Sequence, residues 1–436
     1  MVELKKYKNK KIAIYGMGLT GFSVAKTLKK SGADVFCWDD NIKIRKKIKK
    51  INLATTKFWL NKKESIDNIV LSPGIDINRC KIKKYLKKNL KKIITDLDIF
   101  FEFNKESQII SITGTNGKST TCKIIEKILK EAKYKVNTVG NIGAPVLSLS
   151  KIEKKTIFIL EVSSYQLQYS RFFRSKYAAI LNISPDHLER HKSMKNYIKT
   201  KSRIFFGQKK TDYSYINDNN RHSKYIKNIF KSKNLNSKLI SVKKSSIDFL
   251  LKKINNNNFK TRGNLENLAF AYKISEKLKI SKKTIIKAIN SFKSLPHRQE
   301  IIFSSNKVLC INDSKATSFD ACLQSLSNYN RIYWIVGGEP KLGDKFFIKQ
   351  VKGKIVKAYI IGKSIDFFKK KIMNLVPYKI SNNLSNALNN IKRDMKINKE
   401  SKSTILLSPA AASFDQFSNF ENRGKLFKKL IKKNFR

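Results

Sequence analysis

The chain has 436 residues, which suggests two to four domains at roughly 150 residues per domain. Hydrophobic residues make up 41% of it and aromatic residues 11%, which excludes a largely disordered chain. Its five cysteines form no CxxC pair, which excludes a disulfide scaffold and a zinc ribbon. No apolar run approaches roughly 18 residues and no signal-peptide core is present, so we expect no membrane span and a cytoplasmic location.

Charge is the unusual feature of the composition. Lys plus Arg total 92 and Asp plus Glu total 32, which gives a net charge of +60. Such a balance can indicate nucleic-acid binding, but the lysines are spread over the whole chain, without a basic arm or stripe. We therefore attribute the charge to lysines that occupy solvent-exposed positions throughout the chain. We expect no specific nucleic acid partner, and only weak nonspecific binding to nucleic acid that added salt removes.

Short apolar runs alternate with longer amphipathic stretches from end to end. Strands are predicted at 11–16, 33–38, 68–74, 108–114, 156–164, 178–184, 308–313, 331–338, 357–362 and 404–409. Helical patterns lie between them, for example over 118–132 and 264–278. This alternation predicts an α/β fold with largely parallel sheets. Joints near Ile94 and Leu295, the second where Pro296 is expected to break a helix, give three domains, 1–94, 95–295 and 296–436.

The first glycine-rich motif is GMGLTG, with Gly16, Gly18 and Gly21 between a predicted strand and a helix. Asp39 follows the next strand, as in the dinucleotide fingerprint, where glycines let the backbone approach a phosphate at a helix N-terminus. The alternatives are NAD binding, a different anionic ligand, or a tight turn without a ligand.

The second motif, GTNGKST, ends as a P-loop does, in Gly117-Lys118-Ser119. A P-loop usually has glycine five residues before Gly117, but Ile112 stands there and Gly114 is nearer, so this loop is a shorter variant. Successive backbone N–H groups can still form an anion nest, Lys118 can reach terminal phosphates, and a hydroxyl can meet Mg²⁺. We expect ATP here, which leaves GMGLTG to another anionic ligand.

Two further residues are candidates for a metal site. Glu161 ends a buried strand, where α/β folds place ligands, so it is a magnesium ligand or an ordinary strand-end carboxylate. His187 follows a strand in SPDHLERH. Because Mg²⁺ prefers oxygen, His187 is either a ligand or a hydrogen-bond donor.

Together the motifs resemble the Mur ligases, ATP-dependent amide-forming enzymes of peptidoglycan precursor synthesis. The resemblance rests on GTNGKST, EVSSYQL, GNIG and SPDHLERH, followed by Tyr197, Lys201 and Arg203. GMGLTG and SPGI, with NDSKAT, GGEPKLGD and SPAAASFDQFSNFENRG, resemble the branch that adds D-glutamate to UDP-N-acetylmuramoyl-L-alanine. It implies a cytoplasmic monomer in cell-wall biogenesis, cell shape, cell cycle and cell division, with a Rossmann-like UDP-substrate domain, a central P-loop domain and a Rossmann-like amino-acid domain.

The resemblance also implies roles for single residues. The UDP substrate is expected to contact Leu19, Thr20, Asp39, Asp40, Ser72, Pro73, Gly74 and Asn141. ATP is expected to contact Gly114, Thr115, Asn116, Gly117, Lys118, Ser119, Thr120, Asn267, Arg298 and Asp313. D-Glutamate is expected to contact Lys315, Thr317, Lys341, Ser413 and Phe420.

The family's metal ligands fall on Ser119, Glu161, His187 and, if it is carbamylated, Lys201. Carbamylation would turn a cation into an oxygen-bearing anion that can hold a second Mg²⁺, so the resemblance implies two ions. Lys118, His187 and Lys201 are the expected catalytic residues.

The chain departs from the family pattern at two places. The family's G-x-H-N-x-x-N reads Arg262-Gly263-Asn264-Leu265-Glu266-Asn267 here, without histidine, and helix N-capping is the alternative role for both asparagines. Pro340 stands where glycine is usual, which could shift Lys341. Lys341 could instead be a solvated charge, and Ser413 a helix cap.

Other functions compete with this interpretation. A sister Mur ligase or a folylpolyglutamate synthase shares the short P-loop but not the terminal motifs. An NAD-dependent dehydrogenase would explain only GMGLTG, and a nucleic-acid-binding protein would explain only the charge.

Overall fold

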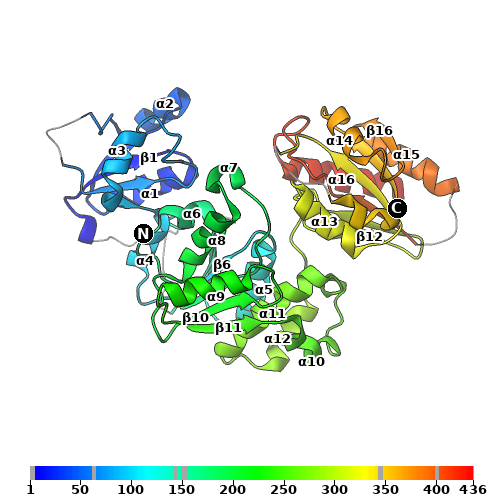
Figure 1. The fold of residues 1–436 in the computed structure, drawn as a ribbon, viewed down its shortest axis with the longest axis horizontal. Helices are drawn as coiled ribbons and strands as arrows, with labels where there is room; N and C mark the ends of the chain where they lie inside the picture. The colour runs from blue at the N-terminus through cyan, green and yellow to red at the C-terminus, as the bar shows by residue number, and fades with distance from the viewer. Residues whose placement is uncertain are drawn as a thin grey trace. The chain divides into compact units, whose positions relative to one another are not determined.

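A computed structural model describes residues 5–60, 65–141, 145–148, 155–341, 347–397 and 402–435. The chain forms two compact units, Met1–Asn257 with Asn264–Phe292, and Asn258–Gly263 with Lys293–Arg436. Three sheets flanked by helices confirm the predicted α/β class (Figure 1). Within the described ranges, no helix is long and apolar enough to cross a membrane.

The first sheet is parallel and has the order β3-β2-β1-β4-β5. Its strands are β1 (Lys11–Tyr15), β2 (Asp34–Trp38), β3 (Ala54–Thr55), β4 (Asn68–Leu71) and β5 (Ile93–Ile94). The helices of this part are α1 (Leu19–Lys30), α2 (Ile42–Lys50), α3 (Lys83–Lys88) and α4 (Asp96–Phe103). The chain order reverses between β1 and β4, so the loops after these two strands border the crevice where such sheets bind ligands.

The second sheet belongs to the same unit, is parallel, and has the order β11-β10-β9-β6-β8-β7. Its strands are β6 (Gln108–Thr113), β7 (Val136–Gly140), β8 (Ile157–Glu161), β9 (Tyr177–Ile180), β10 (Tyr213–Asn217) and β11 (Lys238–Val242). Its helices are α5 (Lys118–Glu131), α6 (Ser164–Tyr169), α7 (Leu188–His191), α8 (Met194–Ser202), α9 (Ser223–Ser232), α10 (Asp248–Leu251), α11 (Arg262–Lys277) and α12 (Lys282–Asn290). β6 is buried from Ile109 to Thr113 because it lies inside the sheet, and the P-loop follows it directly.

The third sheet forms the second unit, in the order β12-β13-β17-β14-β15-β16, with β12 antiparallel to β13 and the other pairs parallel. Its strands are β12 (Glu300–Ser304), β13 (Val308–Asn312), β14 (Ile332–Gly337), β15 (Ile355–Ile361), β16 (Tyr378–Asn382) and β17 (Ser403–Leu407). Its helices are α13 (Phe319–Asn328), α14 (Ile365–Ile372), α15 (Leu384–Ile397) and α16 (Phe420–Phe435).

Every predicted strand is present, and the predicted helices at 118–132 and 264–278 correspond to α5 and α11. The expectation about Pro296 is wrong in detail. α12 already ends at Asn290, where Ser291 caps it, so Pro296 lies in the following connection. The three-domain boundaries themselves stay a prediction.

A buried carboxylate holds two segments of the first unit together. Asp98, in the first turn of α4, accepts a hydrogen bond at Oδ1 from the Ser170 hydroxyl at 2.9 Å. The same oxygen accepts the backbone N–H groups of Arg171, Phe172 and Phe173 at 2.7–3.0 Å, and Oδ2 accepts from Thr95 N at 2.9 Å. The turn after α6 is therefore tied to the start of α4 by one side chain.

Replacing Asp98 with alanine should destabilise this unit strongly. The change leaves several buried donors without an acceptor, so we expect the free energy of unfolding to fall by about 3 kcal/mol. Denaturant titration measures the effect, and the exposed Asp34→Ala serves as the matched control. Equal unfolding midpoints for the two variants would show that Asp98 does not carry this connection.

Candidate active site

The P-loop begins after β6 and ends at the first residue of α5. Gly117 caps α5 with a φ of +82°, and a Cβ there would stand 2.3 Å from Asn267 Oδ1, so both the backbone angle and the space require glycine. Lys118 Nζ donates to the carbonyl oxygens of Gly114 and Thr115, each at 2.8 Å. The ammonium group therefore lies over the loop that is expected to hold phosphate.

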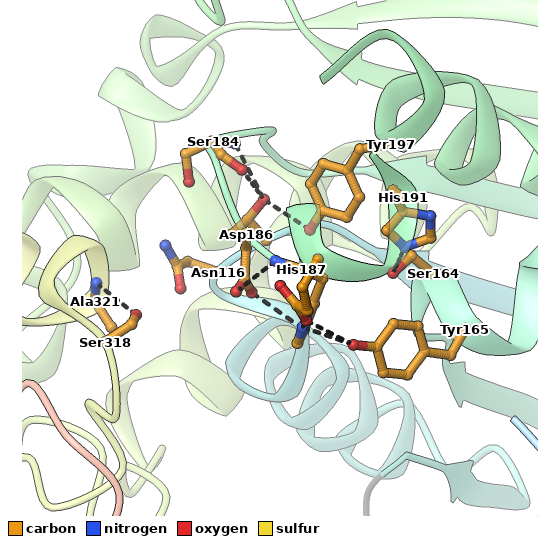
Figure 2. A network of polar contacts seen from close by, with 12 residues as sticks. Asn116, Ser164, Tyr165, Ser184, Asp186, His187, His191, Tyr197, Ser318 and Ala321 are labelled. Carbon is orange, nitrogen blue, oxygen red and sulfur yellow. Dashed lines mark hydrogen bonds and ion pairs between the residues drawn. The ribbon is translucent and has the colours of Figure 1, made fainter. Parts of the chain in front are cut away.

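Side chains from the segment after β9 fix the shape of this loop. Asn182 Oδ1 accepts from Asn116 N at 2.8 Å, and its amide donates back to the Asn116 carbonyl at 3.1 Å. Thr115 Oγ1 accepts from Ser184 N at 3.1 Å and lies 3.3 Å from the Tyr197 hydroxyl (Figure 2). The P-loop and the segment leading to His187 thus form one hydrogen-bonded assembly.

Glu161, at the end of β8, faces the start of α5. Its carboxylate accepts from Ser119 Oγ at 2.6 Å and from the Asn141 amide at 2.9 Å. Ser119 and Glu161 are almost fully buried. This pair of hard oxygen donors beside a P-loop fits a Mg²⁺ ion. Among the described residues, no three His, Cys, Asp or Glu side chains gather into a metal cluster.

His187 has a left-handed backbone, φ 54°, and precedes the short helix α7. Its Nδ1 lies 3.0 Å from the Tyr165 hydroxyl and its Nε2 lies 3.2 Å from Asp186 Oδ2 (Figure 2). These contacts hold the ring in place, and its role as ligand or donor stays a prediction. His191 differs, because its ring is buried and bonded to Ser164 Oγ at 3.0 Å, and burial lowers its pKa to about 4.

Lys201 is almost completely buried in α8, although it is a lysine in a lysine-rich chain. Its Nζ donates to the Gly114 carbonyl at 2.9 Å and lies 4.8 Å from the centre of the Tyr197 ring. Burial, with a smaller contribution from the nearby Lys118, holds the pKa of Lys201 well below that of an exposed lysine. A neutral amine beside the P-loop is the form that can react with CO₂.

Asn267 lies against Gly117, in the second turn of α11, and is buried. Because α11 begins at Arg262, the alternative that Asn264 and Asn267 cap this helix is wrong. Asn267 therefore lies beside the P-loop although the histidine of the family pattern is absent from this chain. Thr120 lies in the first turn of α5 and is partly exposed.

GMGLTG and SPGI meet at the carboxyl ends of β1 and β4. Gly16 has a φ of +92° and its position leaves no room for a Cβ, which would stand 2.9 Å from the Ser72 Cβ. The Ser72 hydroxyl donates to the Gly16 carbonyl. Leu19 is 84% exposed at the start of α1, beside the partly exposed Thr20.

The two aspartates predicted near the uracil have different surroundings. Asp39 accepts from Met17 N at 2.7 Å, so it holds the GMGLTG loop itself. Asp40 accepts from the Tyr15 hydroxyl at 2.7 Å and from the Trp38 indole at 3.2 Å. Both therefore shape the end of the first sheet, and any contact with a nucleotide stays a prediction.

Arg298 and Asp313 lie in the second unit. Asp313 is buried after β13 and accepts from Gln299 N and Ser408 Oγ, each at 3.1 Å. Burial raises its pKa to about 6, while the hydrogen bonds from Ser325, Gln299 and Ser408 and, least of all, the charge of Arg298 favour the ionised form. The role of these two residues, Arg298 and Asp313, in holding ATP stays a prediction.

The residues expected to bind D-glutamate lie in the second unit as well. Lys315 Nζ lies 3.9 Å from the centre of the Phe420 ring, a cation–π contact. Ser413 is buried in a turn, and α16 begins only at Phe420, so the helix-cap alternative for Ser413 is wrong. Thr317 and Lys341 are partly exposed, and residues 342–344 of GGEPKLGD lie outside the described residues.

Two arginines at these sites were missed by the sequence analysis. Arg423 of α16 is buried and donates to Ser314 Oγ at 3.0 Å, the Ser314 carbonyl at 2.9 Å and the Ala411 carbonyl at 3.0 Å. It thereby joins the segments that carry Lys315, Ser413 and Phe420. Arg190 of α7 is the second, and it touches the SPGI loop. The ENRG and LERH strings contain them, but no local pattern marks a charged residue as buried.

A phosphate-binding loop after an inner strand of a parallel sheet defines a nucleotide-binding α/β protein of the P-loop type. Family models named "Mur ligase MurD-like, N-terminal domain" and "Mur ligase middle domain" match residues 10–94 and 112–284. A UDP-N-acetylmuramoylalanine--D-glutamate ligase of Rickettsia felis is 36% identical over 99% of both chains. One of Rickettsia prowazekii is 37% identical over 98% of this chain and 99% of the relative.

Solved structures agree with the fold. A MurF ligase of Thermotoga maritima in complex with ADP superimposes with a TM-score of 0.56, at 14% identity, over 99% of this chain and 97% of that one. The chain belongs to the Mur ligase family.

Proposed function

We propose that this protein is a cytoplasmic, monomeric ligase that uses ATP and Mg²⁺ to join D-glutamate to UDP-N-acetylmuramoyl-L-alanine. The observation that carries the proposal is likeness over the whole length, since relatives bearing this ligase name align with 98–99% of the chain. The local geometry supports it, because the P-loop, Glu161, His187 and Lys201 belong to one unit.

ATP occupies the P-loop in this proposal. Backbone N–H groups at the start of α5 face the phosphates, and the helix dipole favours negative charge there. Lys118 leaves the carbonyl oxygens of Gly114 and Thr115 to contact the terminal phosphates. Asn267, already packed on Gly117, borders the nucleotide.

Ser119 and Glu161 would hold a Mg²⁺ ion, and a carbamylated Lys201 together with His187 would hold a second. Such ions offset the negative charge of the transferred phosphoryl group. As an uncharged amine Lys201 offers only a nitrogen donor, which is why the second site depends on the modification.

The reaction then runs in two steps. An oxygen of the L-alanyl carboxylate attacks the γ-phosphorus of ATP, the bond to the bridging oxygen of ADP breaks, and an acyl phosphate forms. The D-glutamate nitrogen attacks the acyl carbon and gives up a proton, and the carbon–oxygen bond to phosphate breaks. The protein contributes mainly by orienting three anionic reactants, because positioning supplies much of the rate in such transfers.

Each remaining set of residues binds one reactant. The GMGLTG and SPGI loops, with Asp39, Asp40 and Asn141, hold the UDP-linked substrate. Lys315, Thr317, Lys341, Ser413 and Phe420 hold D-glutamate, because two carboxylates need cations and hydroxyl donors. Arg298 and Asp313 contact the nucleoside of ATP.

Phosphate release from ATP tests the proposal. With Mg²⁺ and UDP-N-acetylmuramoyl-L-alanine present, release should require D-glutamate, and L-glutamate should be at least about a hundredfold poorer, since a site built for two carboxylates misplaces the amine of the wrong enantiomer. Omitting the UDP substrate is the matched control. Equal release with either enantiomer, or release without the UDP substrate, would exclude this function.

A further inference from the structure

A buried arginine connects the SPGI loop with the turn that carries His187. Arg190 lies in α7, three residues after His187, and its side chain is only 7% exposed. Its guanidinium donates to the carbonyl oxygens of Gly74, at 3.3 Å, and Ile75. A third bond, at 2.8 Å, runs to Gln168 Oε1.

These bonds go to neutral acceptors rather than to a paired carboxylate. The nearest acid is Asp76, whose Oδ2 lies 3.9 Å from the Nε of both Arg190 and Arg79 and accepts no hydrogen bond from the described residues. When a buried guanidinium donates to two successive backbone carbonyl oxygens, it restricts the conformation of that backbone.

The same guanidinium reaches the surroundings of His187. It lies 5.1 Å from the centre of the Tyr165 ring, and the Tyr165 hydroxyl bonds to His187 Nδ1 at 3.0 Å (Figure 2). Arg190 N also donates to the His187 carbonyl at 3.1 Å. One side chain therefore contacts the SPGI loop on one side and the partner of His187 on the other.

The opposite anchor of the loop is the end of β1. Ser72 N donates to the Tyr15 carbonyl at 3.1 Å, and the Ser72 hydroxyl donates to Gly16. Between the two anchors, Gly74 is exposed and has open space where a Cβ would stand. The bonds of Ser72 and Arg190 thus hold the loop in place, while Gly74 stays exposed to solvent.

We propose that Arg190 is a positioning residue that fixes the loop 72–75 relative to His187 and so sets where the UDP-linked substrate lies relative to the P-loop. The statement about the substrate rests on the proposed function, whereas the statement about the loop does not. Arg190 contacts no expected reactant itself and acts through the backbone of Gly74 and Ile75.

Hydrogen exchange in the free protein tests the loop. We expect Arg190→Gln to speed exchange over 70–78 by about tenfold, since the local opening free energy falls, and to leave 112–120 unchanged. Gln168→Leu, which keeps the arginine but removes its Nε acceptor, should give a smaller change in the same direction and covers the case that Arg190→Gln does not fold. The matched control is Arg79→Gln, because Arg79 is exposed and bonds to the same turn, at the Glu189 carbonyl, but its nearest contact in the measured segment is the side chain of Asp76 and not the backbone of Gly74 or Ile75.

Steady-state kinetics test the substrate part. In Arg190→Gln, KM for the UDP substrate should rise about tenfold while KM for ATP stays within about twofold, because only the UDP substrate depends on the position of the loop 72–75. Unchanged exchange over 70–78, or an equal rise over 70–78 and 112–120, overturns the proposal. Faster exchange with an unchanged KM overturns its substrate part. An inactive wild-type protein overturns the proposed function instead, and the exchange result still decides the role of Arg190 in the loop.

Discussion

Replacing Lys118 with alanine is expected to lower ATP-dependent phosphate release by about a thousandfold, because a preorganised cation at the transferred phosphoryl group is lost. In the free protein Lys118 Nζ donates to two P-loop carbonyls, so the ammonium group is held beside the loop and has to exchange these bonds for phosphate oxygens when ATP binds. The fold should survive, since the aliphatic stem lies at the start of α5 and is partly exposed. Single-turnover release of phosphate measures the effect.

A lysine further along the same helix provides the control. Lys123 pairs with Glu126 at 2.7 Å and is about half exposed, so Lys123→Ala should change the rate by less than about twofold. If Lys118→Ala keeps a rate near that of Lys123→Ala, phosphate transfer does not take place at this loop.

Replacing Lys201 with alanine should have the second largest effect, a loss of about a hundredfold, because a metal ligand and its charge disappear. Carbamylation joins CO₂ to the neutral amine and releases a proton. Burial lowers the pKa of Lys201, so the neutral amine persists to lower pH than in an exposed lysine, and the modification should survive to correspondingly lower pH. ¹³C NMR with labelled bicarbonate should show a carbamate signal that Lys201→Arg abolishes.

Removing dissolved CO₂ should lower the wild-type rate, and restoring it should bring the rate back. Lys199, exposed on the same helix, supplies the control, and Lys199→Ala should keep both the signal and the rate. A carbamate signal that persists in Lys201→Arg, or full activity without CO₂, would contradict this assignment.

Local pattern was enough to predict the P-loop. A strand, a glycine with the right backbone angle, a lysine and a helix occur within a dozen residues, and all are where the sequence puts them. Lys201 is different, because nothing local separates it from the rest of the 92 Lys and Arg residues except the family spacing. Its burial arises from β6, the P-loop and Tyr197, which fold around it.

Buried charges elsewhere could not be predicted for the same reason. Asp98 bonds to residues more than 70 positions away, and Arg423 bonds to Ser314, which is 109 positions away. Edge strands were missed as well. β11 is largely exposed and its apolar pattern is weak, so hydrophobic periodicity does not mark it. Long-range pairing determines which charged side chains are buried, and position in the sheet determines how exposed a strand is.

The most direct test of the central claim follows the oxygen of the substrate carboxylate. UDP-N-acetylmuramoyl-L-alanine labelled with ¹⁸O in its alanyl carboxylate is incubated with ATP, Mg²⁺ and D-glutamate, and the phosphate is analysed by mass spectrometry. Ligation through an acyl phosphate predicts one ¹⁸O in each phosphate released and an equal amount of the D-glutamyl amide. Unlabelled phosphate, or labelled phosphate without the amide, would contradict the account.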